Sequence, residues 1–281
     1  MKRVLLTGAG GAIGVHMLAK LLRDTDWHIV ATDSFRHKGY LDRITTMLGG
    51  NNEWRERITL LIHDLTVPFT SRNIRTIGKA DYIINLASLS DVQDSINNPA
   101  PFITGNVALM LTMLELAREI KPDVFVQFST DEVYGPAEKD SAGHAEWDVI
   151  VPSNPYAASK AAQEAIAISY WRSYGVPLII TNTMNNFGEM QGASKFPAKI
   201  QSALEHGKPV SIHCAADGQI GTRYYLHSEN TADALLYILR HCPPVLHTPG
   251  HIDRPERYNI VGNKQVSNLE LAQTIAALMG K

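Results

Sequence analysis

Hydrophobic positions along this chain form short apolar runs separated by longer segments with helical periodicity. The apolar runs end in Gly, Asp, Asn or Ser and predict buried strands at 1–7, 28–32, 58–62, 82–86, 124–128 and 177–181. The periodic segments predict helices from the glycines after residue 7 to about 22, and at 100–119, 156–174, 230–239 and 268–279. Strands alternating with helices predict an α/β fold, a Rossmann-like, doubly wound parallel sheet that binds ligands at the carboxyl ends of its strands.

The pattern changes at about residue 185, where Gly, Pro and His become more frequent and periodicity weakens. We expect residues 1–184 to form a dinucleotide-binding domain, and 223–245 to return to it because 230–239 is a regular helix. Residues 185–222 and 246–281 are expected to form a smaller substrate-binding part.

A glycine-rich turn follows the first strand directly and opens the first helix. Gly8, Gly11 and Gly14 permit a tight turn, close approach of the backbone to a pyrophosphate, and close packing of helix on strand. A pyrophosphate would lie on the backbone N–H groups around Ala12 and Ile13, at the helix N-terminus. The turn therefore predicts a dinucleotide site, with the spacing Gly-x-x-Gly-x-x-Gly.

The second strand ends in Asp33, about twenty residues after the glycines, where a carboxylate accepts both ribose hydroxyls and repels a 2′-phosphate. This position favours NAD over NADP. Arg36, His37 and Lys38 follow closely and would soften that preference.

Two groups of residues point to proton transfer. Tyr156 and Lys160 share one helix face, so the ammonium would lower the pKa of the phenol and suit it to taking a proton from a hydroxyl. Thr130, Asp131 and Glu132 follow the strand at 124–128 and add a second acid and base. Simple alcohol oxidation would not need that second pair.

Composition narrows the class of protein. With 281 residues, 44% of them hydrophobic, and a formal charge of −2, the chain has the core of an ordinary enzyme and no basic surface for nucleic acid. The apolar stretch 108–117 is too short to span a bilayer, and no apolar leader precedes the first strand, so we expect a cytoplasmic protein without a membrane partner.

Cysteine and histidine give no metal pattern. Cys214 and Cys242 belong to no Cys-x-x-Cys and are expected to be free thiols. His241, His247 and His251 lie near Cys242, but their spacing matches no zinc site, and we expect no metal.

These motifs resemble those of the extended short-chain dehydrogenases/reductases, and among them the NDP-sugar (dTDP-glucose-type) 4,6-dehydratases. The resemblance runs along the whole chain. Its landmarks are 7–14, Asp33, Asp64, Asn85-Leu86-Ala87, Ser129 to Gly135, Pro155 to Lys160, and Asn185-Asn186-Phe187-Gly188.

The resemblance implies conversion of an NDP-hexose to an NDP-4-keto-6-deoxyhexose with a tightly bound NAD. Tyr156 would take the proton of the C4 hydroxyl, Lys160 would hold the phenolate and the nicotinamide ribose, and Thr130 would bond the C4 oxygen. Glu132 would remove the C5 proton, and Asp131 would protonate the departing C6 hydroxyl.

The same resemblance implies further binding residues. Asp64 and Leu65 would face the adenine, Ala87 the cofactor, and Ser88 and Ser90 the nicotinamide or sugar. Asn186, Lys195 and Arg223 would hold the substrate diphosphate and its nucleoside.

Some positions depart from the family pattern. The segment Leu89-Ser90-Asp91-Val92-Gln93-Asp94 stands where members usually have Glu-Ser-His-Val-Asp-Arg, so base and hexose stay open. Family members continue beyond the position of Lys281, which leaves open a compact protein or a longer chain. An NDP-sugar 4-epimerase or decarboxylase, and a non-catalytic NAD-binding protein, remain alternatives.

The helix at 100–119 is apolar on more than one face, and so is the helix that carries Tyr156. In the family these two helices pair with their copies across a two-fold axis. We therefore expect a homodimer, which Leu114→Glu should split if Leu114 lies at its centre. The alternative is that polar loops of the same chain cover the second face.

Overall fold

The computed structural model describes residues 1–37, 39–137 and 143–281. Lys38, one of the basic residues after the second strand, lies outside this range. Within it, seven parallel strands form the main sheet in the order β10-β6-β5-β4-β1-β2-β3. Their bounds are β1 (Arg3–Thr7), β2 (His28–Asp33), β3 (Ile58–Ile62), β4 (Tyr82–Asn85), β5 (Val124–Thr130), β6 (Leu178–Thr183) and β10 (Glu256–Ile260). The predicted Rossmann-like α/β fold is confirmed.

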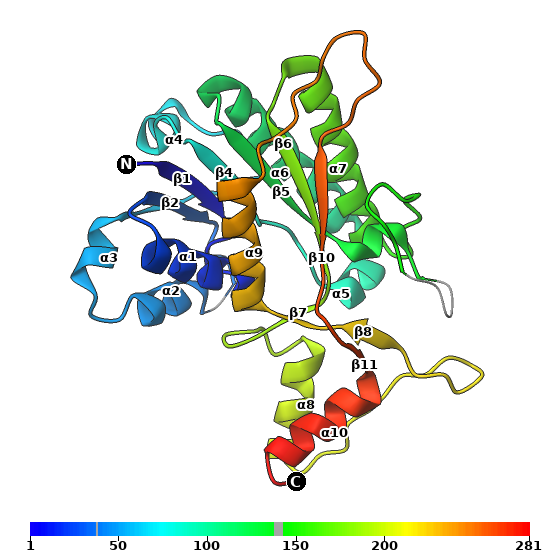
Figure 1. Cartoon of the computed structure of the whole chain (residues 1–281). Coiled ribbons are helices and arrows are strands. Elements are labelled where there is room, and N and C mark those ends of the chain that lie inside the picture. Colours follow the sequence, from blue (N-terminus) through cyan, green and yellow to red (C-terminus); the bar gives the residue numbers. More distant parts are fainter. Residues whose placement is uncertain (38, 138–142) are drawn as a thin grey trace.

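Helices cover both faces of this sheet (Figure 1). In the described ranges they are α1 (Ala12–Asp24), α2 (Tyr40–Leu48), α3 (Asn52–Glu56), α4 (Ser71–Ile77), α5 (Val92–Asn97), α6 (Pro99–Ile120), α7 (Pro155–Tyr174), α8 (Phe196–Glu205), α9 (Ser228–His241) and α10 (Asn268–Leu278). A short 3₁₀ turn, η1 (Asp131–Tyr134), follows β5.

The core lies in two layers because strand side chains alternate between the faces. Val4 and Leu6 of β1 pack with α1 and α9 on one face, and Leu5 packs with α6 and α7 on the other. The long helices α6 and α7 therefore lie directly behind the strand that ends in the predicted catalytic residues (Figure 1).

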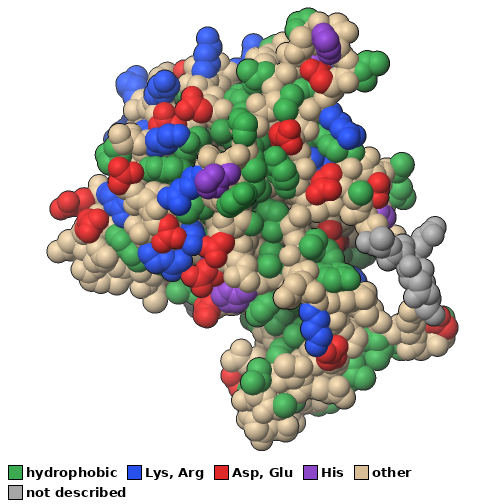
Figure 2. Space-filling model, in the orientation of Figure 1, with side chains coloured by type: hydrophobic (Ala, Val, Ile, Leu, Met, Phe, Trp, Pro, Cys, Tyr) green, Lys and Arg blue, Asp and Glu red, His purple; other side chains and the backbone are tan. Residues whose placement is uncertain are grey.

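A smaller part projects from the main body as a lobe (Figure 2). It contains α8, α10 and an antiparallel pair formed by β8 (Thr222–Tyr224) and β11 (Gln265–Ser267), and the chain ends there (Figure 1). A two-residue parallel pair, β7 (Asn186–Phe187) with β9 (Leu226–His227), lies between α9 and this lobe.

Strand β10 departs from the expected division of the chain. We expected 246–281 to lie in the substrate-binding part, but β10 pairs with β6 and completes one edge of the main sheet. The sequence pattern of this strand, Glu-Arg-Tyr-Asn-Ile, contains too few apolar residues to mark it as a core strand.

Helix α6 corrects two expectations. It has 22 residues, and among the described helices it alone is long and apolar enough to cross a membrane by length and composition, so the argument from a short stretch fails. Half of that stretch is buried against the sheet and α7. Leu114 is fully buried in its own chain, so it does not lie on a free dimer surface.

Candidate active site

The turn between β1 and α1 requires glycine at two positions. Gly8 has φ +65°, and a Cβ there would lie 3.0 Å from the Ala87 backbone. A Cβ on Gly14 would lie 2.0 Å from the Gly8 carbonyl oxygen. No side chain caps α1 at Gly11, and the first turn of this helix carries no acidic residue. The backbone N–H groups in the first turn of α1 are therefore available to an anion. The cradle fits the pyrophosphate of a dinucleotide.

Asp33 lies beside this turn with only 7% of its surface exposed. One carboxylate oxygen accepts the Gly10 N–H at 3.0 Å, and the other accepts the Phe35 N–H at 2.9 Å. Asp33 therefore shapes the glycine turn at the position where the sequence predicts contact with a ribose.

Arg36 forms an ion pair with Asp64, which also accepts the N–H and hydroxyl of Thr66 at 3.0 and 2.8 Å. The pair offsets the charge that we expected to soften the preference for NAD. The two residues predicted to face the adenine therefore have different environments. Leu65 is buried in the core, whereas the Asp64 carboxylate forms an ion pair with Arg36.

The residues after β4 lie next to the glycine turn. Ala87 donates its N–H to the Thr7 hydroxyl at 3.1 Å, and the Ser88 hydroxyl donates to the Leu89 carbonyl at 3.0 Å. Ser90 contributes its carbonyl, which accepts from the Lys195 ammonium at 3.0 Å.

The five predicted catalytic residues come together where β5 meets the start of α7. Thr130 ends β5, and its hydroxyl lies close enough to the Tyr156 phenol to lower its pKa, donates to Asp131 Oδ1 at 3.2 Å and accepts the Glu132 N–H at 3.3 Å. Lys160 is one helical turn after Tyr156 and is buried.

The two acidic residues have different surroundings. Burial, reinforced by the charge of Glu132, raises the pKa of Asp131 from 3.8 to about 6. Glu132 Oε2 accepts a hydrogen bond from Asn154 Nδ2 at 2.9 Å. Two carboxyl groups therefore lie next to each other in η1, and Asp131 holds its proton more readily than an exposed aspartate does.

The predicted effect of Lys160 on Tyr156 is not found. The ammonium donates to the Phe128 carbonyl at 2.7 Å and to Gln163 Oε1 at 2.8 Å. Burial and the charge of Glu132 raise the pKa of the Tyr156 phenol, against the hydrogen bond with Thr130 that lowers it. Burial likewise lowers the pKa of Lys160 to about 7, opposed by the charge of Glu164.

In the described part of the chain, the three residues expected at the diphosphate share no hydrogen-bond partner with one another. Asn186 donates to the Met184 carbonyl at 2.9 Å and accepts from Thr231, so its amide is already used within the fold. Lys195 reaches Ser90 across the site. Arg223 is exposed, and its charge favours the ionised form of Asp131, which places it on the side of the catalytic residues.

A family model described as the NAD dependent epimerase/dehydratase family matches residues 4–260. The chain belongs to this family. It is 32% identical to a dTDP-glucose 4,6-dehydratase of Haemophilus influenzae over 99% of this chain and 80% of the relative. It is equally similar, at 32% over 99% of this chain and 82% of the relative, to the low-salt glycan biosynthesis protein Agl12 of Haloferax volcanii.

Solved structures show the same relationship. The dTDP-glucose 4,6-dehydratase DesIV of Streptomyces venezuelae, crystallised with NAD and TYD, matches with a TM-score of 0.85 at 26% identity, covering 99% of this chain and 81% of that one. The UDP-glucuronic acid 4-epimerase of Bacillus cereus also gives a TM-score of 0.85, covering 99% and 83%, but at 22% identity this shows the fold alone.

Membership of the NAD-dependent epimerase/dehydratase family confirms the prediction of NAD as cofactor. In this chain the glycine turn, Asp33 and the Ala87–Ser88 backbone are the groups placed to hold it. Sequence reasoning missed Asn154, which touches Glu132 and also caps α7 by accepting the Ala157 N–H at 2.8 Å. The signal was present, because Asn before Pro and a helix is a typical N-cap.

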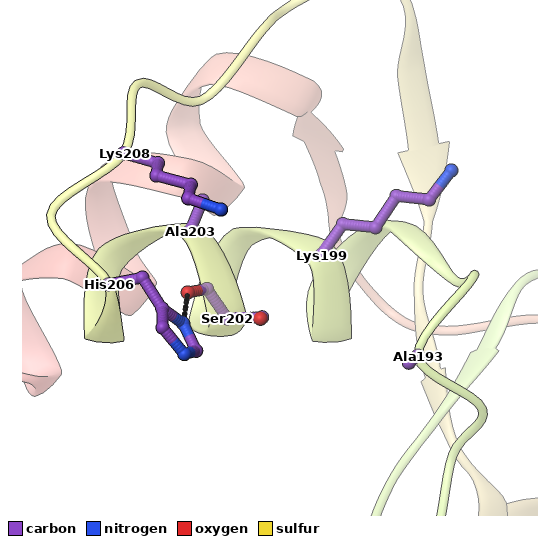
Figure 3. A pocket seen from close by; sticks show the side chains of 6 residues that line it. All are labelled: Ala193, Lys199, Ser202, Ala203, His206 and Lys208. Carbon is purple, nitrogen blue, oxygen red and sulfur yellow. Dashed lines mark hydrogen bonds between the residues drawn. The ribbon is translucent and has the colours of Figure 1, made fainter.

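A hollow on the smaller lobe and the histidines considered for zinc lie outside this site. A hollow of about 300 Å³ on α8 is lined by Ala193, Lys199, Ser202, Ala203, His206 and Lys208, none of which was predicted as a site residue (Figure 3). Over the described part of the chain, no group of three His, Cys, Asp or Glu residues is placed to hold a metal ion. His247, one of the histidines considered for zinc, pairs with Asp253 instead.

Proposed function

We propose that this chain is an NDP-sugar 4,6-dehydratase, which oxidises C4 of an NDP-hexose, eliminates water across C5 and C6, and returns the hydride to C6. The observation that carries the proposal is the pair Asp131 and Glu132 beside Thr130 and Tyr156. An acid whose pKa is raised to about 6, beside a second carboxyl group that can act as the base and beside two hydroxyl groups, suits an elimination, and a simple redox or epimerase reaction does not need this pair. Relatives at 30% identity or more that are named 4,6-dehydratases support it.

The residues divide the reaction as follows. Thr130 and Tyr156 bind the C4 hydroxyl, and Tyr156 takes its proton as hydride leaves C4. Bound NAD would supply the hydride acceptor and donor, held by the glycine turn, Asp33 and the Ala87–Ser88 backbone.

Once C4 is a ketone, the C5 proton is acidic and Glu132 removes it. Asp131 gives its proton to the C6 hydroxyl, which leaves as water. Hydride return to C6 would be supplied by the cofactor, and Glu132 returns its proton to C5. The proton held by Tyr156 passes to Asp131 through solvent, so the acid and the base are restored and the product differs from the substrate by one water.

The test is incubation of the purified protein with dTDP-glucose, UDP-glucose, UDP-GlcNAc and UDP-glucuronic acid. We expect one hexose donor to lose one water by mass spectrometry and to acquire the alkaline absorbance of a 4-keto sugar. An isobaric product would identify a 4-epimerase, and loss of carbon dioxide a decarboxylase. No product from any donor would leave a non-catalytic NAD-binding protein.

A further inference from the structure

Glu164 of α7 and Arg257 of β10 form an ion pair that the proposed chemistry does not use. Arg257 Nη2 lies 2.8 Å from Glu164 Oε2, and the two side chains are 1% and 0% exposed. Removing two charges from water is costly unless other hydrogen bonds complete the pair. The other hydrogen-bond partners of this pair lie around the turn that carries the catalytic residues.

Glu164 holds the end of β5. Its second oxygen, Oε1, accepts hydrogen bonds from the Ser129 hydroxyl and from Asn182 Nδ2, the latter at 2.8 Å. The same Asn182 amide donates to the carbonyl of Thr130 at 3.0 Å. Glu164 thus fixes the two residues that directly precede Asp131.

Arg257 holds the other side of the same turn. Its Nη1 lies 3.2 Å from Asn182 Oδ1 and 3.4 Å from the hydroxyl of Tyr134, the last residue of η1. The indole of Trp147 covers the guanidinium, with its ring centre 4.3 Å from Arg257 Cζ. Contacts from the pair therefore bracket Asp131 and Glu132 from both sides.

The pair also connects this turn to α7. Tyr156, Lys160 and Glu164 follow one another at four-residue spacing and so share one face of the helix. One carboxylate therefore joins the helix that carries the phenol and the ammonium to the strand that leads directly into the two acids.

We propose that Glu164 and Arg257 are positioning residues, which fix the turn Thr130–Glu132 against Tyr156 for the elimination step. The proposal rests on the proposed function for its kinetic consequence. The effect that it predicts on opening of the turn Thr130–Glu132 can be measured without any substrate.

The experiment compares wild type with Glu164→Gln/Arg257→Met, which replaces both charges by neutral side chains of similar size. Without a lone buried charge, the double variant is expected to keep a melting midpoint closer to wild type than either single variant. We expect kcat to fall about 10–100-fold, as for a small misplacement of reacting groups, while KM changes less than about threefold. Recovery of kcat together with stability in the double variant would show that the pair only stabilises the fold.

Arg257→Lys provides a second test, because it keeps the charge and loses the fork that reaches Asn182, Tyr134 and Glu164 together. It is expected to fold and to show the same loss of kcat at nearly constant KM. Wild-type kcat in this variant would overturn the proposal, whether or not the double variant folds.

Amide hydrogen exchange separates this proposal from the proposed function. The Glu132 and Gly135 amides, which bond Thr130 Oγ1 and the Glu132 carbonyl, are expected to exchange at least about tenfold faster in Arg257→Lys than in wild type. The Val15 amide of α1 serves as the internal control. Unchanged exchange at the turn would overturn the positioning role even if no nucleotide sugar reacts with the wild type.

Discussion

The side-chain amide of Asn154 donates a hydrogen bond to Glu132 Oε2 at 2.9 Å, while its oxygen caps the helix that carries Tyr156. Asn154 therefore contacts the proposed base, Glu132, and also caps the N-terminus of α7. Serine caps helices as well as asparagine does, but is too short to reach Glu132.

We expect Asn154→Ser to leave the free energy of unfolding within about 0.5 kcal/mol of wild type and to slow elimination about tenfold, the value of one hydrogen bond to a charged group. Asn154→Ala, which loses the cap too, should also lose about 1 kcal/mol of stability. Denaturant unfolding and turnover on the same samples measure both effects. Full activity of Asn154→Ser would contradict a role for this contact in catalysis.

Substitutions of Tyr156 and Glu132 are expected to block different steps of the reaction. Tyr156→Phe should abolish hydride transfer, with a loss of about 10²–10⁴-fold, because nothing else takes the proton from the C4 hydroxyl. Glu132→Gln should still exchange hydride between C4 and NAD but should not wash solvent deuterium into C5. Mass spectrometry of the recovered sugar checks this, and normal C5 labelling in Glu132→Gln would assign the base elsewhere.

Asp131 should make the folded protein less stable at neutral pH. Its pKa is raised from 3.8 to about 6, so the folded state resists ionisation that the unfolded chain accepts. The stability contributed by the protonated form is complete below pH 4 and is lost as pH rises through 6. Asp131→Asn should thus match wild type at pH 4 and be about 2 kcal/mol more stable at pH 8.

Urea unfolding at the two pH values tests this, with Asp26→Asn, an exposed position on another surface, as the control. If the free energies of unfolding of Asp131→Asn and wild type differ by the same amount at pH 4 and pH 8, ionisation of Asp131 does not destabilise the folded state.

Asp33 is expected to decide the preference for NAD. Asp33→Asn keeps an acceptor for the Gly10 or Phe35 N–H and removes the charge that repels a 2′-phosphate. Hydrogen bonds to a charged acceptor are worth about 1.5–3 kcal/mol, so the ratio of NAD to NADP affinity should fall at least about tenfold in titration calorimetry. Tighter binding of NADP than NAD by the wild type would assign the preference to Arg36 or Lys38 instead.

The expected homodimer is tested best at Leu111 of α6. This side chain is 48% exposed, Ile103 two turns earlier is 37% exposed, and Leu114 is fully buried. Leu111→Glu should split the dimer and keep the helical circular dichroism, whereas Leu114→Glu should unfold the chain because it buries a charge. Light scattering of the wild type at the mass of one 31.0 kDa chain would refute the dimer.

Local patterns in the sequence were enough for much of the fold. The apolar runs at β3 and β4, the glycine turn into α1, and the spacing of Tyr156 and Lys160 depend on neighbours within a few residues. Periodicity and turn chemistry act at that range, so these elements could be predicted before any contact was known. Family membership and the NAD cofactor followed from the same short motifs.

Tertiary structure decided what depends on distant groups. The direction of the Tyr156 pKa shift follows from burial and from the charge of Glu132, and not from the helical neighbour Lys160 that the sequence suggested. Arg257 meets Glu164 only because β10 joins the main sheet, and Leu114 is buried only because α6 packs against it. Burial and charge are properties of the packed molecule, and no local spacing records which partners the fold brings together.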